Sequence, residues 1–406
     1  MPLVLKIGFL GLLLLISYQY FQIQIFAYPD PIPFSGSYFY NPYHSLETCW
    51  QKTNFHSHAI AWGGLTNGHQ PGNEVQTAYR QLGYDLPYLS DYFSVNATQD
   101  VCSDSFMPIY EHGMNIHKSH RLAIGSEKVS YFDVMLFQNQ DIRQYLIKRL
   151  KQTAPIVAIN HPTMRDSHPI RMLENLSGYD YLEVINSFRV ATTHWDAALS
   201  AGKPVYILAN DDCHDIRKAH KIGKSWTMVQ SNHQHRDSIL YALRLGKTYG
   251  VQRLHDSLSI EQLQTMIWRR QSDNLVKSFS VTNGTINVKF TKPISTIRAI
   301  GQNGTLLKET ANTDEFGYSF QPGDSYVRLE AQTPALAYFF NPVIRYDGKN
   351  IPSNVLTAKV RFWPTFLLRL SIIYCNLLVI ALLLKPYFKA GLQTLPPSPV
   401  FTPNYP

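Results

Sequence analysis

The sequence lacks the paired cysteines that mark thiolate metal sites and redox centres. Only four cysteines occur in 406 residues, and no two of them form a CxxC pair. We therefore expect neither a thiolate zinc site nor a thioredoxin-like centre. Cys49 and Cys102 could form a disulfide in an exported domain, a question that the sequence leaves open.

Charge of one sign is not concentrated anywhere in the chain. Only 16% of the residues are charged, and the formal net charge is +8. The longest basic run is KRLK at residues 148–151, which falls on an expected helix. A solvated helix face accounts for such a run better than a binding stripe does. We therefore expect no nucleic-acid partner.

Two apolar stretches lie near the ends of the chain. Residues 3–18 form an apolar run that Lys6 interrupts, which predicts a signal peptide or an uncleaved signal anchor over residues 1–27. Residues 362–384 are long enough to be a transmembrane helix, since a bilayer span takes about 20 residues. The alternative for this second stretch is a buried C-terminal helix.

Positive residues favour the cytoplasmic side of a membrane, and they predict the topology. Lys385 and Lys389 follow the second stretch, and Lys6 precedes the core of the first. Both termini are therefore expected in the cytoplasm, with the membrane-anchored catalytic domain on the extracytoplasmic (periplasmic or extracellular) side. The proline-rich tail, residues 385–406, is expected to be disordered.

Short apolar runs alternate with helical patterns over residues 28–255. The expected strands are residues 86–89, 156–159, 181–185 and 205–209, and the expected helices are residues 74–82, 141–151, 195–201 and 235–245. Such alternation predicts an α/β barrel or an open α/β sheet.

The pattern changes after a helical connector at residues 256–274. Residues 275–350 contain two Asn-Gly pairs between strand-like runs, at residues 283–284 and 303–304. Asn-Gly suits the positive φ angles of a type I′ hairpin turn. A small antiparallel β domain, resembling a sandwich, is therefore expected to follow the α/β domain.

Histidines and carboxylates fall at the ends of the expected strands. His56 and His58 are two residues apart, so they can reach one ion from the same face of a strand. In α/β folds, the carboxyl ends of the strands form the functional face. The candidate metal ligands are His56, His58, Asp91, Glu111, His120, His161, Asp212 and His214.

Over residues 50–250, the order and spacing of these motifs resemble the PHP (polymerase and histidinol phosphatase) superfamily, and within it the membrane-associated or exported hydrolases. The motifs are FHSH at 55–58, GYD and LSD over 83–91, YEHG at 110–113, NHP at 160–162, LEVIN at 182–186 and DDCH at 211–214. The resemblance implies a distorted PHP-type (β/α) barrel that carries a metal-dependent hydrolase.

Two departures from the family pattern bear on the number of ions. Tyr92 stands where the family usually has a histidine, and residues 62–64 fill the region of another histidine. The remaining ligands suffice for two divalent transition-metal ions, and a third ion is doubtful. Histidine and carboxylate ligands accept zinc, manganese or iron.

A centre of this kind activates water for the hydrolysis of a small-molecule ester, above all a phosphoester. Glu111, at the position of the bridging glutamate, and Asp212 are the expected catalytic residues. Arg121, Arg165 and Lys224 are candidates to hold an anionic substrate group, although each could equally be an ordinary surface charge. Two alternatives stay open. One is hydrolysis of a carboxylic or carbamic ester, or an amide, and the other is a catalytically silent, membrane-anchored ligand-binding protein.

Overall fold

The computed structural model describes residues 3–44, 49–98, 102–255, 259–262, 265 and 275–393. Within them the chain forms two compact units. The first combines residues 1–25 with residues 360–406, and the second comprises residues 26–359. Most of the expected connector at residues 256–274 lies outside the described residues. Cys49 and Cys102 are exposed and are not joined by a disulfide.

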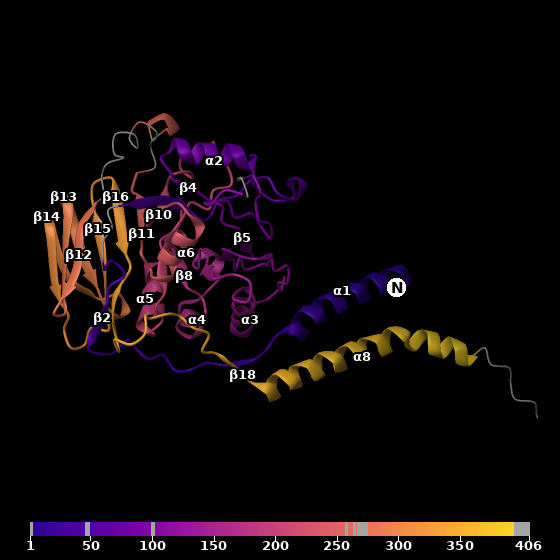
Figure 1. The fold of residues 1–406 in the computed structure, drawn as a ribbon. Coiled ribbons are helices and arrows are strands. Elements are labelled where there is room, and N and C mark those ends of the chain that lie inside the picture. Colours follow the sequence, from indigo (N-terminus) through magenta and orange to yellow (C-terminus); the bar gives the residue numbers. More distant parts are fainter. Residues whose placement is uncertain are drawn as a thin grey trace, which may run out of the picture. The chain divides into compact units, whose positions relative to one another are not determined.

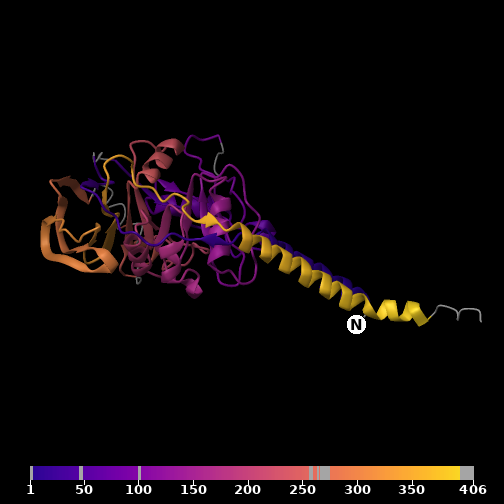
Figure 2. The same ribbon diagram turned by 90° about the horizontal axis from the view of Figure 1, so that it is seen from below.

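The first unit contains two helices, α1 (Leu3–Gln22) and α8 (Phe362–Gln393). Each holds a stretch apolar and long enough to cross a membrane, Val4–Gln22 and Phe362–Lys385. The two helices lie alongside each other (Figure 2), and the Lys6 ammonium donates to the carbonyl of Leu383 at 3.3 Å. The helices could be membrane anchors, or the first could be a signal sequence. The second continues beyond residue 384 into the expected tail.

The second unit contains a five-stranded sheet in the order β5-β6-β7-β8-β9. Its strands are β5 (Ile109–His112), β6 (Arg121–Ile124), β7 (Ile156–Ile159), β8 (Tyr181–Ile185) and β9 (Tyr206–Ala209). The pairs β7–β8 and β8–β9 are parallel, whereas β5–β6 and β6–β7 are antiparallel. All these strands are buried, which explains why the sequence shows β7 and β9 as continuous apolar runs.

Helices of the second unit follow strands of this sheet and of a second, larger sheet, in the alternation that the sequence predicts (Figure 1). They are α2 (Gly72–Gln81), α3 (Gln140–Leu150), α4 (Ile170–Asn175), α5 (Thr192–Ser200) and α6 (Arg236–Arg244), with 3₁₀ turns at Trp62–Gly64, Met164–Asp166 and Gln302–Gly304. Residues of α3, α4 and α5, among them Ile147, Leu173 and Trp195, share a hydrophobic core with β7, β8 and β9. The α/β class is therefore confirmed.

An eleven-stranded sheet runs through both expected domains. In the α/β part it contains β3 (Trp50–Asn54), β4 (Leu86–Pro87), β10 (Ser225–Gln230) and β11 (Thr248–Arg253), and β11 pairs with β16 (Leu336–Phe340) of the β part. Its other strands are β2 (Tyr38–Tyr40), β12 (Val276–Thr282), β13 (Thr285–Ile300), β14 (Leu306–Ser319), β15 (Tyr326–Gln332) and β17 (Val343–Tyr346). The short strands β1 (Phe26–Ala27) and β18 (Lys359–Val360) lie where the two units join along the chain.

The hairpin prediction is confirmed at the first Asn-Gly pair, because Asn283 and Gly284 have φ angles of 51° and 72° and close the pair Thr282–Thr285, whereas the second pair lies in the 3₁₀ turn that joins β13 to β14. The barrel prediction is not confirmed. The strands of the described residues form separate sheets, and none of these sheets closes on itself. Strand directions are mixed in the large sheet as well, since β10 pairs antiparallel with both β3 and β11, whereas β3 and β4 are parallel.

Candidate metal centre

The predicted ligands come from loops and strands that converge on one buried place. His56 and His58 follow β3, and Glu111 lies in β5. His120 directly precedes β6 and His161 follows β7, while Asp212 and His214 follow β9. His161 and Asp212 have positive φ angles, 28° and 50°, which residues other than glycine adopt rarely and which cluster at functional sites.

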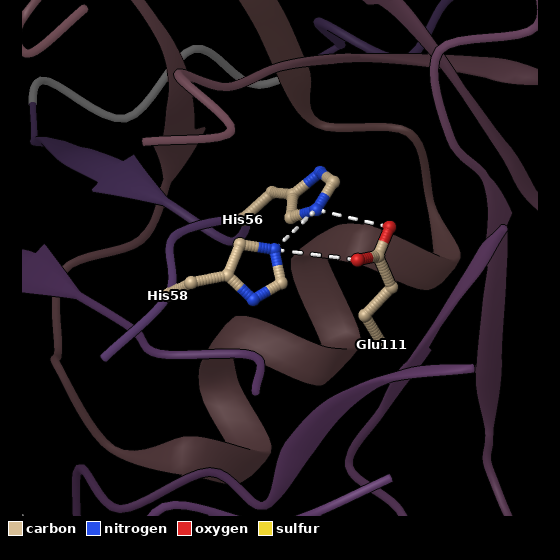
Figure 3. A group of neighbouring side chains, drawn as sticks. All are labelled: His56, His58 and Glu111. Atoms are coloured by element: carbon tan, nitrogen blue, oxygen red, sulfur yellow. Dashed lines mark hydrogen bonds and ion pairs between the residues drawn. The ribbon is translucent and has the colours of Figure 1, made fainter. Parts of the chain in front are cut away.

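Glu111 lies at the middle of the centre, with its two oxygens turned to different histidines (Figure 3). Its Oε1 lies 3.1 Å from Nε2 of His56, and its Oε2 lies 3.3 Å from Nε2 of His58. The two imidazole nitrogens are themselves only 3.2 Å apart. Glu111 Oε1 also lies 3.0 Å from His120 Nδ1 and 3.4 Å from His161 Nε2.

Asp212 is a second carboxylate that lies close to several of the histidines. Its Oδ1 lies 3.2 Å from His56 Nε2, 3.4 Å from His58 Nε2 and 3.8 Å from His214 Nε2. Seven of the eight predicted ligands therefore form four overlapping groups of three, each with ligand atoms within 4.8 Å of one another. Glu111 and Asp212 each belong to two of these groups. The buried groups could bind a metal ion.

The protonation states suit a cation. Burial raises the pKa of Glu111, but the imidazoles of His120 and His56 outweigh it and hold that pKa well below its usual value. Asp212 likewise has a lowered pKa, because His56 and His58 outweigh its burial. Burial and the neighbouring His58 lower the pKa of His214 to about 3, which keeps its ring neutral. Glu111 Oε2 and Asp212 Oδ1 are buried carboxylate oxygens without a hydrogen-bond donor, as expected of atoms that face a cation.

Asp91 is the predicted ligand that the structure does not bring into these groups. Its Oδ1 accepts the backbone N–H of Ala59 at 2.7 Å, and its Oδ2 accepts the side-chain amide of Asn96 at 2.7 Å. Both oxygens therefore hold neighbouring loops in place. The contacts of Asp91 give its predicted ligand role no support.

Tyr92 lies against two of the predicted ligands as a neutral ring. It stacks on His58 with ring centroids 4.6 Å apart and meets His120 edge-on at 5.5 Å. Burial and the carboxylates of Glu111 and Asp212 raise the pKa of Tyr92, so its hydroxyl keeps its proton. Such a phenol is a poor metal ligand, but it can donate a hydrogen bond.

Sequence reasoning missed Glu183 as a site residue, although it lies in the quoted LEVIN segment. Its Oε1 accepts from His56 Nδ1 at 2.9 Å and from the Asn210 amide at 3.1 Å. Its Oε2 accepts the backbone N–H of His161 at 3.0 Å. Asn160 was missed in the same way, and its amide donates to Glu111 Oε1 at 2.8 Å. A second carboxylate that fixes a ligating imidazole is a common feature of metal sites.

The three residues expected to hold an anionic group have other contacts. Arg121 is fully buried, and its guanidinium donates to the carbonyl and hydroxyl oxygens of Ser119, both at 3.2 Å. Arg165 is exposed and donates to the Ile116 carbonyl at 3.3 Å. The backbone N–H of Lys224 donates to Asp211. Their substrate-binding role stays a prediction.

Comparisons with known proteins give distant likenesses among solved structures alone. No protein-family model matches the chain. No curated protein matches it either. Among solved structures, the chain is similar to a two-domain protein from Bacteroides vulgatus ATCC 8482 that contains a predicted PHP-like metal-dependent phosphoesterase. The two are 14% identical, and the match covers 84% of this chain and 98% of the other, with a TM-score of 0.39. A likeness of this degree carries no argument about activity.

Proposed function

We propose that this chain is a metal-dependent hydrolase of ester bonds, with a PHP-type centre that holds two divalent ions. The observation that carries the proposal is the sharing of Glu111 and Asp212 among overlapping buried groups of ligands. One carboxylate with its two oxygens on different sides can serve two neighbouring ions. Divalent ions at such a site supply a nucleophilic water at neutral pH and a Lewis acid for the developing oxyanion.

The residues of the chain have distinct roles in this proposal. Glu111 and Asp212 contribute negative charge, and their lowered pKa values keep them ionised, so neither takes up the proton of the attacking water. His214 contributes a neutral nitrogen. Tyr92 keeps its proton and can donate a hydrogen bond to Glu111 or to a substrate oxygen. The buried surroundings strengthen each of these interactions because they exclude water.

A phosphoester is the proposed substrate class, and zinc, manganese and iron all suit the ligands. A carboxylic or carbamic ester, or an amide, is the alternative, since the same ions stabilise either oxyanion. We further propose that the apolar helices anchor the catalytic unit on the extracytoplasmic side. The reason is that lysines favour the cytoplasmic side of a membrane, and Lys385 and Lys389 follow the second apolar stretch.

Elemental analysis of the purified full chain, combined with turnover on a panel of soluble phospho- and carboxyl esters, tests the proposal. We expect two transition-metal ions per chain and hydrolysis that Glu111→Gln lowers by at least about a hundredfold, roughly 2.8 kcal/mol in the barrier. Glu309→Gln, on an exposed strand, is the matched control. Only traces of metal, or turnover of Glu111→Gln within tenfold of wild type, would refute it.

A further inference from the structure

Two loops of the second unit present a group of exposed apolar side chains. Phe137 and Tyr131 are 67% and 66% exposed, which is unusual for large aromatic residues in a compact unit. We call the group the apolar rim, and its members are Met114, Ile116, Tyr131, Met135, Leu136 and Phe137. Exposed apolar clusters of this kind mark surfaces that bind something.

The loops that carry the rim are held in place. The buried carboxylate of Asp133 accepts the backbone N–H of Met114 at 2.6 Å and the side-chain amide of Gln138 at 2.8 Å. The backbone N–H of Ile116 donates to the carbonyl of Met135 at 3.2 Å. The two loops are therefore joined to each other, and their apolar side chains are exposed by a defined structure.

The rim adjoins the candidate metal centre. One of its loops connects Glu111 to His120, two predicted ligands. On the other side, the ring of Tyr131 lies 6.4 Å from that of Trp62, whose indole donates to the carbonyl of Tyr92 at 2.7 Å. Whatever binds the rim therefore lies next to the place where an ester would be cleaved.

The ends of this unit are both held by helix α3, which begins directly after the rim. The carboxylate of Asp141 accepts the backbone N–H of Phe26 at 3.0 Å, and Phe26 is the first residue of the unit. The side chain of Gln144 donates to the Ser177 carbonyl at 2.8 Å, and the Ser177 hydroxyl accepts the N–H of Ala358 at 3.2 Å. The unit ends one residue later.

These attachments limit how far a membrane can be from the rim. Phe137 is four residues from Asp141, which an extended chain spans in less than about 15 Å. The candidate spans end at Gln22 and begin again at Phe362, a few residues from the ends that α3 holds. Aromatic side chains favour the polar interface that covers each side of the hydrocarbon core. A bilayer crossed by these helices is thus within reach of the rim.

We propose that the apolar rim inserts into the interface of a bilayer and holds the metal centre at the level of the lipid headgroups. The assignment of the substrate rests on the proposed function: the ester is then one carried by a membrane lipid. The reacting group reaches the centre laterally from the bilayer, beside Glu111 and His120.

Fluorescence quenching tests the docking independently of turnover. The full chain, with serine in place of the exposed Cys49, Cys102 and Cys375, carries Phe137→Cys labelled with an environment-sensitive dye and is reconstituted in lipid nanodiscs, one chain per disc. Leu306→Cys is the control, since Leu306 is 53% exposed on β14, far along the chain from the rim. We expect spin-labelled lipid to quench the dye at position 137 roughly fivefold more than at 306.

A second measurement compares turnover of a lipid phosphoester in the disc with that of a soluble phosphoester. The double variant Leu136→Ser/Phe137→Ser should lower the ratio of lipid to soluble turnover by about tenfold or more, since two large apolar side chains lose their burial. Tyr241→Ser, another exposed residue, should leave the ratio unchanged.

The possible results separate docking from hydrolysis. Equal quenching at 137 and 306 overturns the docking even if the protein binds metal and cleaves esters, and one chain per disc removes contact with a second copy as its cause. If quenching at 137 is strong but Leu136→Ser/Phe137→Ser leaves the ratio of lipid to soluble turnover unchanged, the proposal of a lipid-borne substrate is overturned. Strong quenching without turnover on any ester supports the docking and refutes the proposed hydrolase, and the lipid substrate with it.

Discussion

Replacement of Glu183 by glutamine should weaken metal binding while leaving the fold intact. The carboxylate is buried and accepts from the ring of His56, from the backbone of His161 and from the amide of Asn210. The bond to His56 Nδ1 leaves Nε2 free to face Glu111 and Asp212. A glutamine has nearly the same shape, but its amide group can place a donor opposite the imidazole N–H and carries no charge.

Two estimates of the effect agree. Loss of a hydrogen bond to a charged group costs about 1.5–3 kcal/mol. Substitution of the partner that orients a ligating histidine lowers metal affinity about 10- to 100-fold, which is roughly 1.4–2.8 kcal/mol. We therefore expect the dissociation constant to rise by one to two orders of magnitude.

Competition with a chromogenic chelator measures this constant in the purified chain, and circular dichroism checks the fold. Glu309→Gln is the control, because it removes a charge from an exposed strand where Glu309 pairs with Arg298. An affinity of Glu183→Gln within twofold of wild type would show that this carboxylate does not orient His56 for a metal.

Four further outcomes are expected. His56→Ala or Asp212→Ala should abolish turnover with an unchanged circular dichroism spectrum, and turnover within about tenfold of wild type (~1.4 kcal/mol) would show that neither binds the ion. Burial alone would lower the pKa of His56, but three carboxylates raise it well above its usual value. The ring of His56 is therefore protonated without metal, and a metal ion has to displace its proton in order to bind. Calorimetry in several buffers should therefore detect proton release and an affinity that falls as the pH drops below this raised pKa; an affinity independent of pH would contradict this. Anomalous scattering from crystals should locate two full-occupancy ions, and a third within ~2.3 Å of the Tyr92 oxygen would contradict the two-ion centre. Protease added to intact cells should cut the catalytic unit and spare a tag after Pro406. Loss of the tag together with the unit would contradict the predicted topology.

The sequence predicted the elements well where burial leaves a clear pattern. Residues 156–159 and 181–185 are strands with the expected bounds, because strands covered on both faces are mostly apolar, and Glu183 is the one charged residue in these two. The run at 86–89 gives a strand only at Leu86–Pro87. The arrangement of strands was harder to predict, since an apolar run carries no record of which neighbour it pairs with or in which direction. The antiparallel pairing of β11 with β16, which joins the two parts of the large sheet, had no sequence signal.

In the candidate site too, some residues could be predicted from the sequence and others could not. His56 and His58 were found because their spacing places both on one face of an extended segment. Glu183 lies inside β8 rather than at its end, so a search of strand ends did not single it out. Asp91 has the expected position after a strand, but its carboxylate accepts the backbone N–H of Ala59. A carboxylate in a sequence can serve either as a metal ligand or as a hydrogen-bond acceptor, and the residue type does not tell which. Residue type and spacing therefore locate the centre, whereas hydrogen-bond partners assign the roles.

In the proposed centre, the charge of the ions would take the part that an arginine could play in holding an anionic substrate. Glu111 and Asp212 are ionised and the Tyr92 phenol is neutral, while histidines bind metal ions as neutral rings. Two divalent ions would therefore outweigh the carboxylates that face them and leave a net positive charge in a buried place, where it acts strongly on an anionic ester. The ions would then supply the attraction for the substrate, which is consistent with an Arg121 that donates to Ser119. On this reasoning, removal of the metal should abolish the binding of an anionic substrate analogue as well as turnover.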